Sequence, residues 1–249
     1  MQSIRRAIIQ TPLYEAIRSF RARKKLRFYS KFVTRDALCF DVGANIGDRV
    51  RIFLQLQAHV VAVEPQDECV RILRTAYGSN PRLTIVQKAL GECEGEADVM
   101  ISDAHVLSSL SPDWIDAVRK SGRFSEYVWD KKQVVSVTTL DKLIEQYGIP
   151  AFIKIDVEGF EYQVMKGLSR PVETLSFEFI PEFIESAFKC INHLQRLGDI
   201  RLNYSVGESM HLALKQWVTP QDMVKVLSGF IGNNRFFGDV YVQFPIQNK

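Results

Sequence analysis

Short apolar runs alternate with amphipathic helical segments along most of this 249-residue chain. The alternation starts at Ala37, and runs of this length are typical of buried strands rather than helices. Strands separated by helices of about ten to fifteen residues predict a parallel sheet covered by helices, which is an α/β fold. The seven strands that we expect are Leu38–Val42, His59–Glu64, Leu83–Lys88, Phe152–Val157, Thr174–Phe179, Leu202–Ser205 and Asp239–Phe244.

Five helices are expected beside these strands, at Asp48–Gln57, Asp67–Tyr77, Thr139–Tyr147, Tyr162–Leu168 and Pro181–Leu197. Residues 91–137 interrupt the rhythm with several serines, a proline and a glycine. We interpret this stretch as a short hairpin plus an excursion over one edge of the sheet. Excursions of this kind often carry substrate contacts.

The composition is that of one globular domain, because 46% of the residues are hydrophobic and 24% are charged. We expect the domain to span residues 37–249. No apolar run approaches the roughly 18 residues that cross a bilayer, and the first thirty residues lack the pattern of a secretory signal, so we expect a cytoplasmic protein. The cysteines form no CxxC pair and are expected to be reduced packing residues: Cys39, Cys69, Cys93 and Cys190.

The positive charge is concentrated at the start of the chain. Residues 1–36 hold ten Lys and Arg against two acids, whereas residues 37–249 hold 22 against 27. An acidic body argues against a nucleic-acid groove. Thr11 followed by Pro12 marks a helix start, with Phe20 on the apolar stripe, so residues 1–36 form a basic helical arm. The arm either packs on the body by that stripe or touches an anionic membrane or acidic partner, through residues 1–32.

A glycine-bearing turn follows the first strand, in the sequence CFDVGANIGDR. Gly43 and Gly47 permit tight backbone geometry, and the helix start that follows presents free N–H groups to an electron-rich ligand. Glu64, at the end of the next strand, lies about 20 residues beyond the turn, where nucleotide-binding α/β folds grip a ribose diol. Asn45 stands where a pyrophosphate requires glycine, which disfavours a dinucleotide and an NAD-dependent oxidoreductase. A nucleoside with an amino-acid end fits better, with Asp41 and the turn amides facing that end.

These residues resemble a family of enzymes. The motifs in order are FDVGANIGDR, VEP, KALGE at residues 88–92, SSL at 108–110, TTLDKLI at 138–144 and FIKIDVEGFEYQVMKGL at 152–168. Together they are similar to the FkbM-type S-adenosylmethionine-dependent methyltransferases. The resemblance covers about residues 38–167, and more loosely the strands after Thr174.

The resemblance implies a Rossmann-like, seven-stranded class I methyltransferase sheet that is parallel except for one antiparallel strand. It also implies S-adenosylmethionine as cofactor and O-methylation of a hydroxyl on a sugar, glycan or natural product. By motif position, the cofactor contacts would be Asp41, Gly43, Asn45, Gly47, Glu64, Lys88 and Ala89, with the last two beside the adenine. Asp156 would lie nearest the reacting centre.

The candidate catalytic residues are acids near the ends of two strands and one loop histidine. Asp156 and Glu158 follow a nearly wholly apolar strand at the edge where parallel sheets bind ligands. Glu178 lies between two phenylalanines, where burial would raise its pKa and suit it to act as a base. His105, just before the SSL motif, could accept a proton from the acceptor.

Two other interpretations stay open. The three acids Asp156, Glu158 and Glu178 have hard oxygen ligands that suit a divalent cation, but the sequence lacks a ligand loop of diagnostic spacing, so we expect metal independence. A protein that keeps the fold without catalysis, and docks through its basic arm, is the alternative to an enzyme. The sequence leaves the acceptor and the oligomeric state open.

Overall fold

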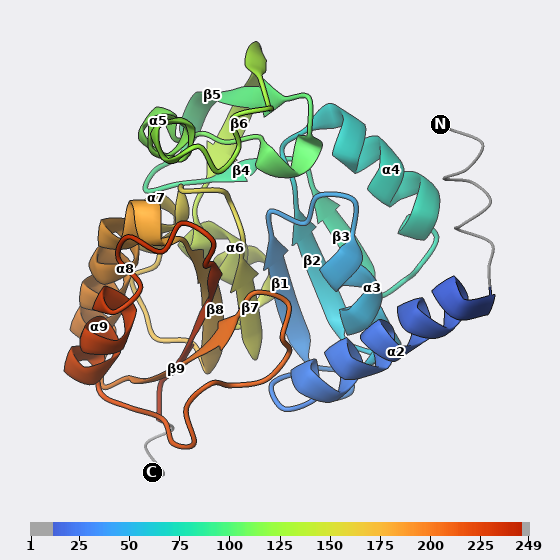
Figure 1. Cartoon of the computed structure of the whole chain (residues 1–249). Coiled ribbons are helices and arrows are strands. Elements are labelled where there is room, and N and C mark those ends of the chain that lie inside the picture. Colours follow the sequence, from blue (N-terminus) through green and yellow to red (C-terminus); the bar gives the residue numbers. More distant parts are fainter. Residues whose placement is uncertain (1–11, 246–249) are drawn as a thin grey trace.

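The computed structural model describes residues 12–245 and, within them, the side chains from Phe20 onward. Figure 1 shows one large sheet with helices on both faces and a small sheet above one edge. The large sheet has the strand order β3-β2-β1-β7-β8-β10-β9. Its strands are β1 (Leu38–Val42), β2 (His59–Val63), β3 (Leu83–Val86), β7 (Phe152–Ile155), β8 (Thr174–Phe179), β9 (Arg201–Val206) and β10 (Gly238–Gln243).

All seven expected strands are confirmed, with small shifts at their ends. The direction of the strands is also as expected, because only β10 runs against its neighbours. It pairs antiparallel with β8 on one side and with β9 on the other. The pairs β1–β2, β1–β7, β2–β3 and β7–β8 are parallel. The carboxyl ends of β1, β2, β7 and β8 therefore meet at one edge of the sheet.

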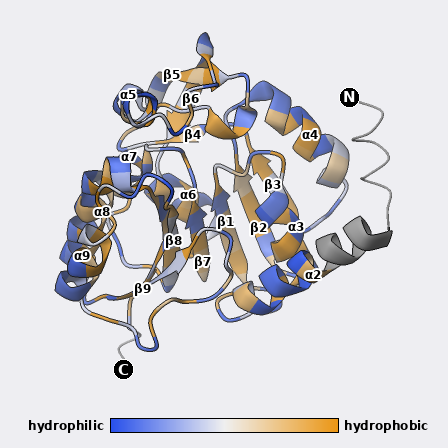
Figure 2. Cartoon of the chain, in the orientation of Figure 1, coloured by the Kyte–Doolittle hydropathy of each residue, from blue (hydrophilic) through white to orange (hydrophobic). Residues whose placement is uncertain are grey.

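Helices cover both faces of the sheet, because successive side chains of each strand point to opposite faces and both faces are apolar. Phe40 and Val42 of β1 lie in the core beneath α6 (Leu140–Tyr147), α7 (Glu161–Lys166), α8 (Ile184–Leu197) and α9 (Pro220–Ser228). Cys39 lies in the core on the opposite face, beneath α2 (Pro12–Tyr29) and α3 (Asp48–Gln55), with α4 (Asp67–Tyr77) at the edge. In Figure 2 the strands are largely hydrophobic, whereas the helices carry hydrophilic residues on their outer sides. Both faces bury apolar side chains, the main source of stability.

The end of α2 is built into the core. Phe32 stacks between Phe152 and Tyr241, with ring centroids 5.5 and 5.3 Å apart, and Phe28 and Tyr29 are buried beside it. Phe20, which was expected on the apolar stripe, is 69% exposed and does not pack on the body. The actual contact begins two turns later, where the helix reaches the body. Residues 1–11 of the expected arm lie outside the described residues.

A second sheet forms the excursion, with the order β4-β6-β5. It contains β4 (Ala89–Leu90), β5 (Gly95–Ser102) and β6 (Trp129–Thr138), with a short 3₁₀ helix η1 (His105–Leu107) and helix α5 (Pro112–Ser121) between β5 and β6. In place of the expected short hairpin, β5 and β6 pair antiparallel across a long connection that carries η1 and α5. The sequence analysis missed α5, although Ser111 caps it by accepting a hydrogen bond from the Trp114 amide at 3.2 Å. It also missed α9, which Thr219 caps in the same way.

Two smaller findings complete the fold. Cys39, Cys69 and Cys190 are buried free thiols, but Cys93 is exposed, so the expectation that it packs in the core is wrong. Cys93 lies in the turn between β4 and β5, where the chain runs over the surface.

Within residues 12–245, no helix combines the length and apolarity required to cross a membrane.

Candidate active site at the carboxyl edge of the sheet

The glycine turn joins two strand ends. Gly43 adopts φ +79°, and its amide and that of Ala44 donate hydrogen bonds to the Val63 carbonyl at 2.9 and 3.0 Å. A Cβ on Gly43 would lie 1.8 Å from the backbone oxygen of Asp156, so no larger residue fits there. The turn is therefore pressed against the end of β7. Gly47 serves a different contact, because its Cβ would lie 2.8 Å from atoms of Leu73 and Tyr77 in and near α4.

Glu64 closes the turn from the side of β2. The Asn45 amide donates to one carboxylate oxygen at 2.8 Å, and the Gln66 amide donates to the other at 2.9 Å. Burial raises the pKa of Glu64, and these backbone bonds act in the opposite direction. Each oxygen of the carboxylate keeps a lone pair for a further donor. The acid is thus fixed in place and still able to accept hydrogen bonds from a diol.

A cavity of about 50 Å³ lies over the turn. Its walls include Gly43, Asn45, Glu64, His105, Asp156 and Glu158, so residues from both halves of the edge face one space. The His105 carbonyl accepts hydrogen bonds from Asn45 Nδ2 at 3.3 Å and Gln66 Nε2 at 3.2 Å. These two bonds hold η1 across the opening. Ligand pockets usually measure roughly 300–1,000 Å³, so this space is smaller than a ligand of nucleoside size requires.

Asp41 is the second-to-last residue of β1, just before the glycine turn. It is 1% exposed, and its Oδ2 has no hydrogen-bond partner among the described residues. Burial raises its pKa to about 7, although Arg49 and Lys154 lower it. A buried carboxylate oxygen without a partner is unusual and indicates a missing donor. The residues present therefore fit a ligand with an ammonium group or a water-mediated contact to one.

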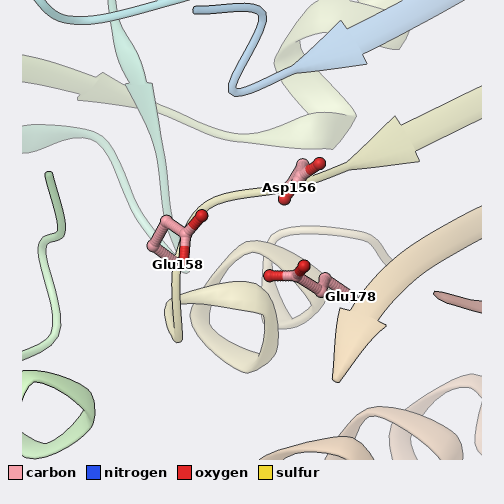
Figure 3. Close-up of side chains that lie close together, drawn as sticks. All are labelled: Asp156, Glu158 and Glu178. Carbon is pink, nitrogen blue, oxygen red and sulfur yellow. The ribbon is translucent and has the colours of Figure 1, made fainter. Parts of the chain in front are cut away.

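Three carboxyl groups converge on the other half of the edge. Asp156 and Glu158 follow β7 and Glu178 is the second-to-last residue of β8, and one oxygen from each lies within 4.8 Å of the other two (Figure 3). The expectation of a raised pKa at Glu178 is confirmed. Burial raises the pKa of both Glu178 and Glu158 well above the ordinary value, and the charge of Asp156 raises both further. These groups bind protons more readily than ordinary surface acids.

The loop after β7 is held by the excursion. Glu158 adopts φ +50°, and its carbonyl accepts a hydrogen bond from Ser109 Oγ at 2.5 Å. Gly159 adopts φ +87°, and a Cβ there would lie 2.2 Å from the Trp114 side chain. Glu161 Oε1 accepts hydrogen bonds from the Val157 and Gly159 amides at 3.3 and 3.2 Å. The SSL motif therefore positions the acidic loop.

Lys154 is a functional candidate that the sequence analysis missed. It is 1% exposed, and its Nζ lies 2.7 Å from Asp239 Oδ1 and 3.1 Å from Asp156 Oδ2. The available signal was a lysine inside the apolar run FIKI, where a cation without a partner would be very costly. Its main partner, on β10, is distant in sequence and offered no local clue.

Lys88 and Ala89 lie apart from the other expected contacts. Lys88 is exposed after β3, Ala89 is buried in β4, and neither lines the cavity over the turn. Their contact with an adenine stays a prediction. Asp41 and Gly47 also lie outside the lining, one below the turn and the other against α4.

A larger cavity, of about 970 Å³, opens at the other end of the sheet. Val172, Arg201 and Phe244 line it, beside the start of β8. Open α/β sheets bind their ligands outside the carboxyl ends of the strands, so the smaller cavity over the turn is the candidate site.

The strand order, the single antiparallel strand and the turn with its acid at the carboxyl edge define the class I methyltransferase architecture. Residues 41–217 match the family model described as "Methyltransferase FkbM domain". The chain belongs to this family.

Three proteins with a similar sequence or fold share 10–23% of their residues with the aligned part of this chain. The hexuronic acid methyltransferase AglP of Haloferax volcanii is 23% identical over 157 residues, which are 62% of this chain and 59% of AglP. A precorrin-6y C5,15-methyltransferase from Geobacter metallireducens aligns with a TM-score of 0.44 and 11% identity, covering 88% of each chain. A SAM-dependent O-methyltransferase from Thermotoga maritima aligns with a TM-score of 0.42 and 10% identity, covering 91% of this chain and 66% of that one.

Proposed function

We propose that the protein is an S-adenosylmethionine-dependent methyltransferase that methylates a hydroxyl of a sugar, a glycan or a related natural product. One observation carries the proposal: a single cavity is lined by Glu64 on the side expected for the cofactor and by Asp156 on the side expected for the acceptor. Membership of the FkbM family and the name of the distant relative AglP, a hexuronic acid methyltransferase, support the glycan class of acceptor.

The cofactor side has the donors and acceptors that the ligand requires. Glu64 would accept hydrogen bonds from the ribose hydroxyls, and Asp41 would face the ammonium end. Asn45 and the turn glycines Gly43 and Gly47 would shape the backbone around it, while Lys88 and Ala89 are proposed beside the adenine. The bound cofactor would supply an electrophilic methyl carbon on a positively charged sulfur.

Binding requires η1 to move. The cavity of about 50 Å³ is several times smaller than a pocket for a ligand of this size, which is at least roughly 300 Å³. The hydrogen bonds that would have to break are those from the side-chain amides of Asn45 and Gln66 to the His105 carbonyl. Each costs only about 0.5–1.5 kcal/mol to lose when water replaces the partner, so opening is feasible.

The acceptor side supplies alignment and a proton acceptor. An acceptor hydroxyl must lose its proton during methyl transfer, and a positioned base contributes on the order of 10²- to 10⁴-fold. Asp156 would orient the hydroxyl, and Glu158 or Glu178, with their raised pKa, would receive the proton. His105 lines the same cavity and is the other candidate base.

The test is to incubate the purified protein with S-adenosylmethionine and a panel of acceptors, and to measure the mass of each acceptor. The panel contains glucuronic acid, glucose, N-acetylglucosamine, an undecaprenyl-linked sugar and a simple alcohol. A mass gain of one methyl group on a sugar supports the proposal, and no gain on any compound contradicts it. Turnover that survives EDTA is expected for a metal-independent enzyme, whereas its loss would assign a cation to the three converging acids.

A second role, docking to an anionic surface, is favoured by the outer face of α2. Phe20, Lys24 and Arg27 follow one line along α2, at spacings of four and three, and all are exposed; Lys31, in the turn after the helix, is also exposed. Arg23 lies beside them. A basic line with an exposed aromatic ring is typical of helices that lie on anionic membranes. A protein that used only this face would be the non-catalytic alternative.

Charge reversal tests this role better than truncation, because Phe28, Tyr29 and Phe32 belong to the core. We expect the wild type to sediment with phosphatidylglycerol vesicles but not with phosphatidylcholine vesicles. The variant Arg23→Glu/Lys24→Glu/Arg27→Glu should lose this binding and keep its affinity for S-adenosylhomocysteine. Equal sedimentation of both proteins would contradict membrane docking through α2.

A further inference from the structure

Lys154 is a buried cation shared by two carboxylates that differ in their surroundings. Asp239 lies in β10 with a side chain 9% exposed, whereas the side chain of Asp156 is 32% exposed and lines the cavity. The ammonium group lies 2.7 Å from the first and 3.1 Å from the second. Lys154 therefore connects the interior of the sheet to the wall of the candidate site.

The sheet register explains how one side chain spans this distance. Lys154 faces Asp41 on β1 and Ser176 on β8, in the register of its two neighbours. Asp156 is two residues further along and so projects to the same face. The Lys154 side chain extends toward the carboxyl edge of the sheet, where Nζ also donates a hydrogen bond to the Ile155 carbonyl at 3.4 Å.

The charge of this lysine is secure. Burial lowers the pKa of Lys154, but Asp156 and Asp239 outweigh that effect and raise it well above the ordinary value. The charged and titratable groups around it come from every neighbouring element. They are Asp41 on β1, Glu158 after β7, Glu178 on β8, Asp239 on β10, Arg49 on α3 and Tyr29 on α2.

We propose that Lys154 is a positioning residue, which holds the Asp156 carboxylate against the wall of the methyl-transfer cavity while Asp239 anchors the lysine from below. The inference rests on the proposed function for its catalytic consequence, although the position of the carboxylate can be measured without it. An ion pair that served stability alone would need only Asp239, which is the more buried and nearer partner. The contact with Asp156 goes beyond that need.

The reason for such a device is the crowding of acids at this edge. Three carboxyl groups lie within 4.8 Å of one another, and like charges at that distance repel. A carboxylate with one third of its side chain exposed would turn toward water to escape them. Lys154 opposes that movement. A misplacement of about 1 Å can cost about 10²-fold in rate, so the effect on turnover should be large.

The experiment compares Lys154→Met, Asp239→Asn and the double variant with the wild type. Lys154→Met leaves Asp239 buried without a counter-ion and should lower the midpoint of urea unfolding. The double variant removes both members of that pair, so its midpoint should recover toward that of the wild type. Lys142→Met, which removes an exposed lysine paired with Glu145 at 2.9 Å, is the matched control.

Positioning and stability make different predictions for the double variant. If Lys154 positions Asp156, the kcat of the double variant stays about 10²-fold below that of the wild type, although its fold is stable. The substrate for this measurement is the panel sugar that the wild type methylates. The Kd for S-adenosylhomocysteine should stay within about threefold, because Glu64 and the turn are unchanged. Asp239→Asn alone weakens the anchor but keeps the contact between Lys154 and Asp156, so its kcat should fall less than that of the double variant. Recovery of kcat together with the urea midpoint would overturn the proposal.

A crystal structure of the double variant gives a readout that does not depend on turnover. The proposal expects the Asp156 carboxylate to leave the cavity wall, and an unchanged carboxylate position would overturn it. If the wild type methylates no compound, the proposed function fails, and the two crystal structures still decide whether Lys154 holds Asp156.

Discussion

The two halves of the carboxyl edge solve opposite problems. On the half formed by β1 and β2, Glu64 receives one backbone N–H on each carboxylate oxygen. On the half formed by β7 and β8, Glu158 and Glu178 have a raised pKa from burial and from the nearby charge of Asp156. The first half fixes its acid by backbone hydrogen bonds, which suits the proposed cofactor side. The second half brings several acids close together, which suits the proposed proton acceptor.

The largest expected effect breaks the second half alone. Asp156→Asn removes the charge but keeps the size of the side chain, so kcat should fall by roughly 10²- to 10⁴-fold. The Kd for S-adenosylhomocysteine, measured by calorimetry, should change little, because Glu64 is the side chain that we propose binds the ribose. A loss of both kcat and affinity would instead make Asp156 a cofactor ligand and would erase the division into halves.

The next effect breaks the contact between the halves. Gly43→Ala should lower the free energy of unfolding by about 2–5 kcal/mol, since alanine is strained at φ +79° and its Cβ would overlap the Asp156 carbonyl. Gly122→Ala is the matched control, because Gly122 has φ +77° with no atom within 4 Å of the added Cβ. Urea unfolding of both variants separates the two contributions. Equal losses would show that the overlap is relieved without cost.

One part of the pH dependence of stability should come from an acid next to the second half, Glu161. Burial raises the pKa of Glu161 to about 7 from its ordinary 4.5. The folded state therefore binds this proton more tightly, and the resulting stability is complete below about pH 4.5 and is lost as the pH rises through about 7. Glu161→Gln should remove up to roughly 3 kcal/mol of that loss.

Urea unfolding at about pH 5 and about pH 7.5 checks this slope. Burial also raises the pKa of Asp41 to about 7, so Asp41 contributes to the pH dependence of stability with the same sign. This contribution should remain in the Glu161→Gln variant. Glu208, whose pKa is lowered to about 2, acts below this window. An unchanged slope in Glu161→Gln would mean that Glu161 is not the titrating group.

The smallest expected effect sharpens the contrast between two carboxylates. In Glu64→Gln, the side-chain NH₂ group replaces one oxygen and faces a backbone N–H, so one hydrogen bond is lost. This should destabilise the side chain in its observed position by about 1–3 kcal/mol. Glu161→Gln keeps its bonds, because Oε1 alone accepts both amides. The affinity for S-adenosylhomocysteine at about pH 7 should therefore fall roughly tenfold in the first variant and little in the second. Equal affinities would remove Glu64 from the cofactor contacts.

The features that the sequence predicted correctly are those with local signals. The period of the apolar runs predicted all seven strands, and the glycine turn and Glu64 were found from spacing along the chain. Phe177 and Phe179 beside Glu178 indicated its raised pKa, which depends on burial within one strand. The membership of the FkbM family followed from several short motifs in order.

The features that it missed depend on contacts between distant segments. The partners of Lys154 include Asp239, which is 85 residues away in the chain. Gly43 was expected to permit tight backbone geometry, but the group that makes this necessary, the Asp156 carbonyl, belongs to a distant segment of the chain. The narrowness of the cavity depends on η1, and hydrogen bonds to a backbone carbonyl carry no sequence pattern. Helix α5 had a visible Ser-Pro start that was outweighed by the surrounding serines.

The meeting of Trp114 with Gly159 has a consequence for exchanging parts between relatives. The indole occupies the space that any side chain at position 159 would need. A chimaera that receives the small sheet and α5 from another methyltransferase would align the acidic loop only if its aromatic residue and this glycine came from the same parent. The small sheet with α5 and the acidic loop after β7 must therefore be exchanged together, although 45 positions separate Trp114 from Gly159.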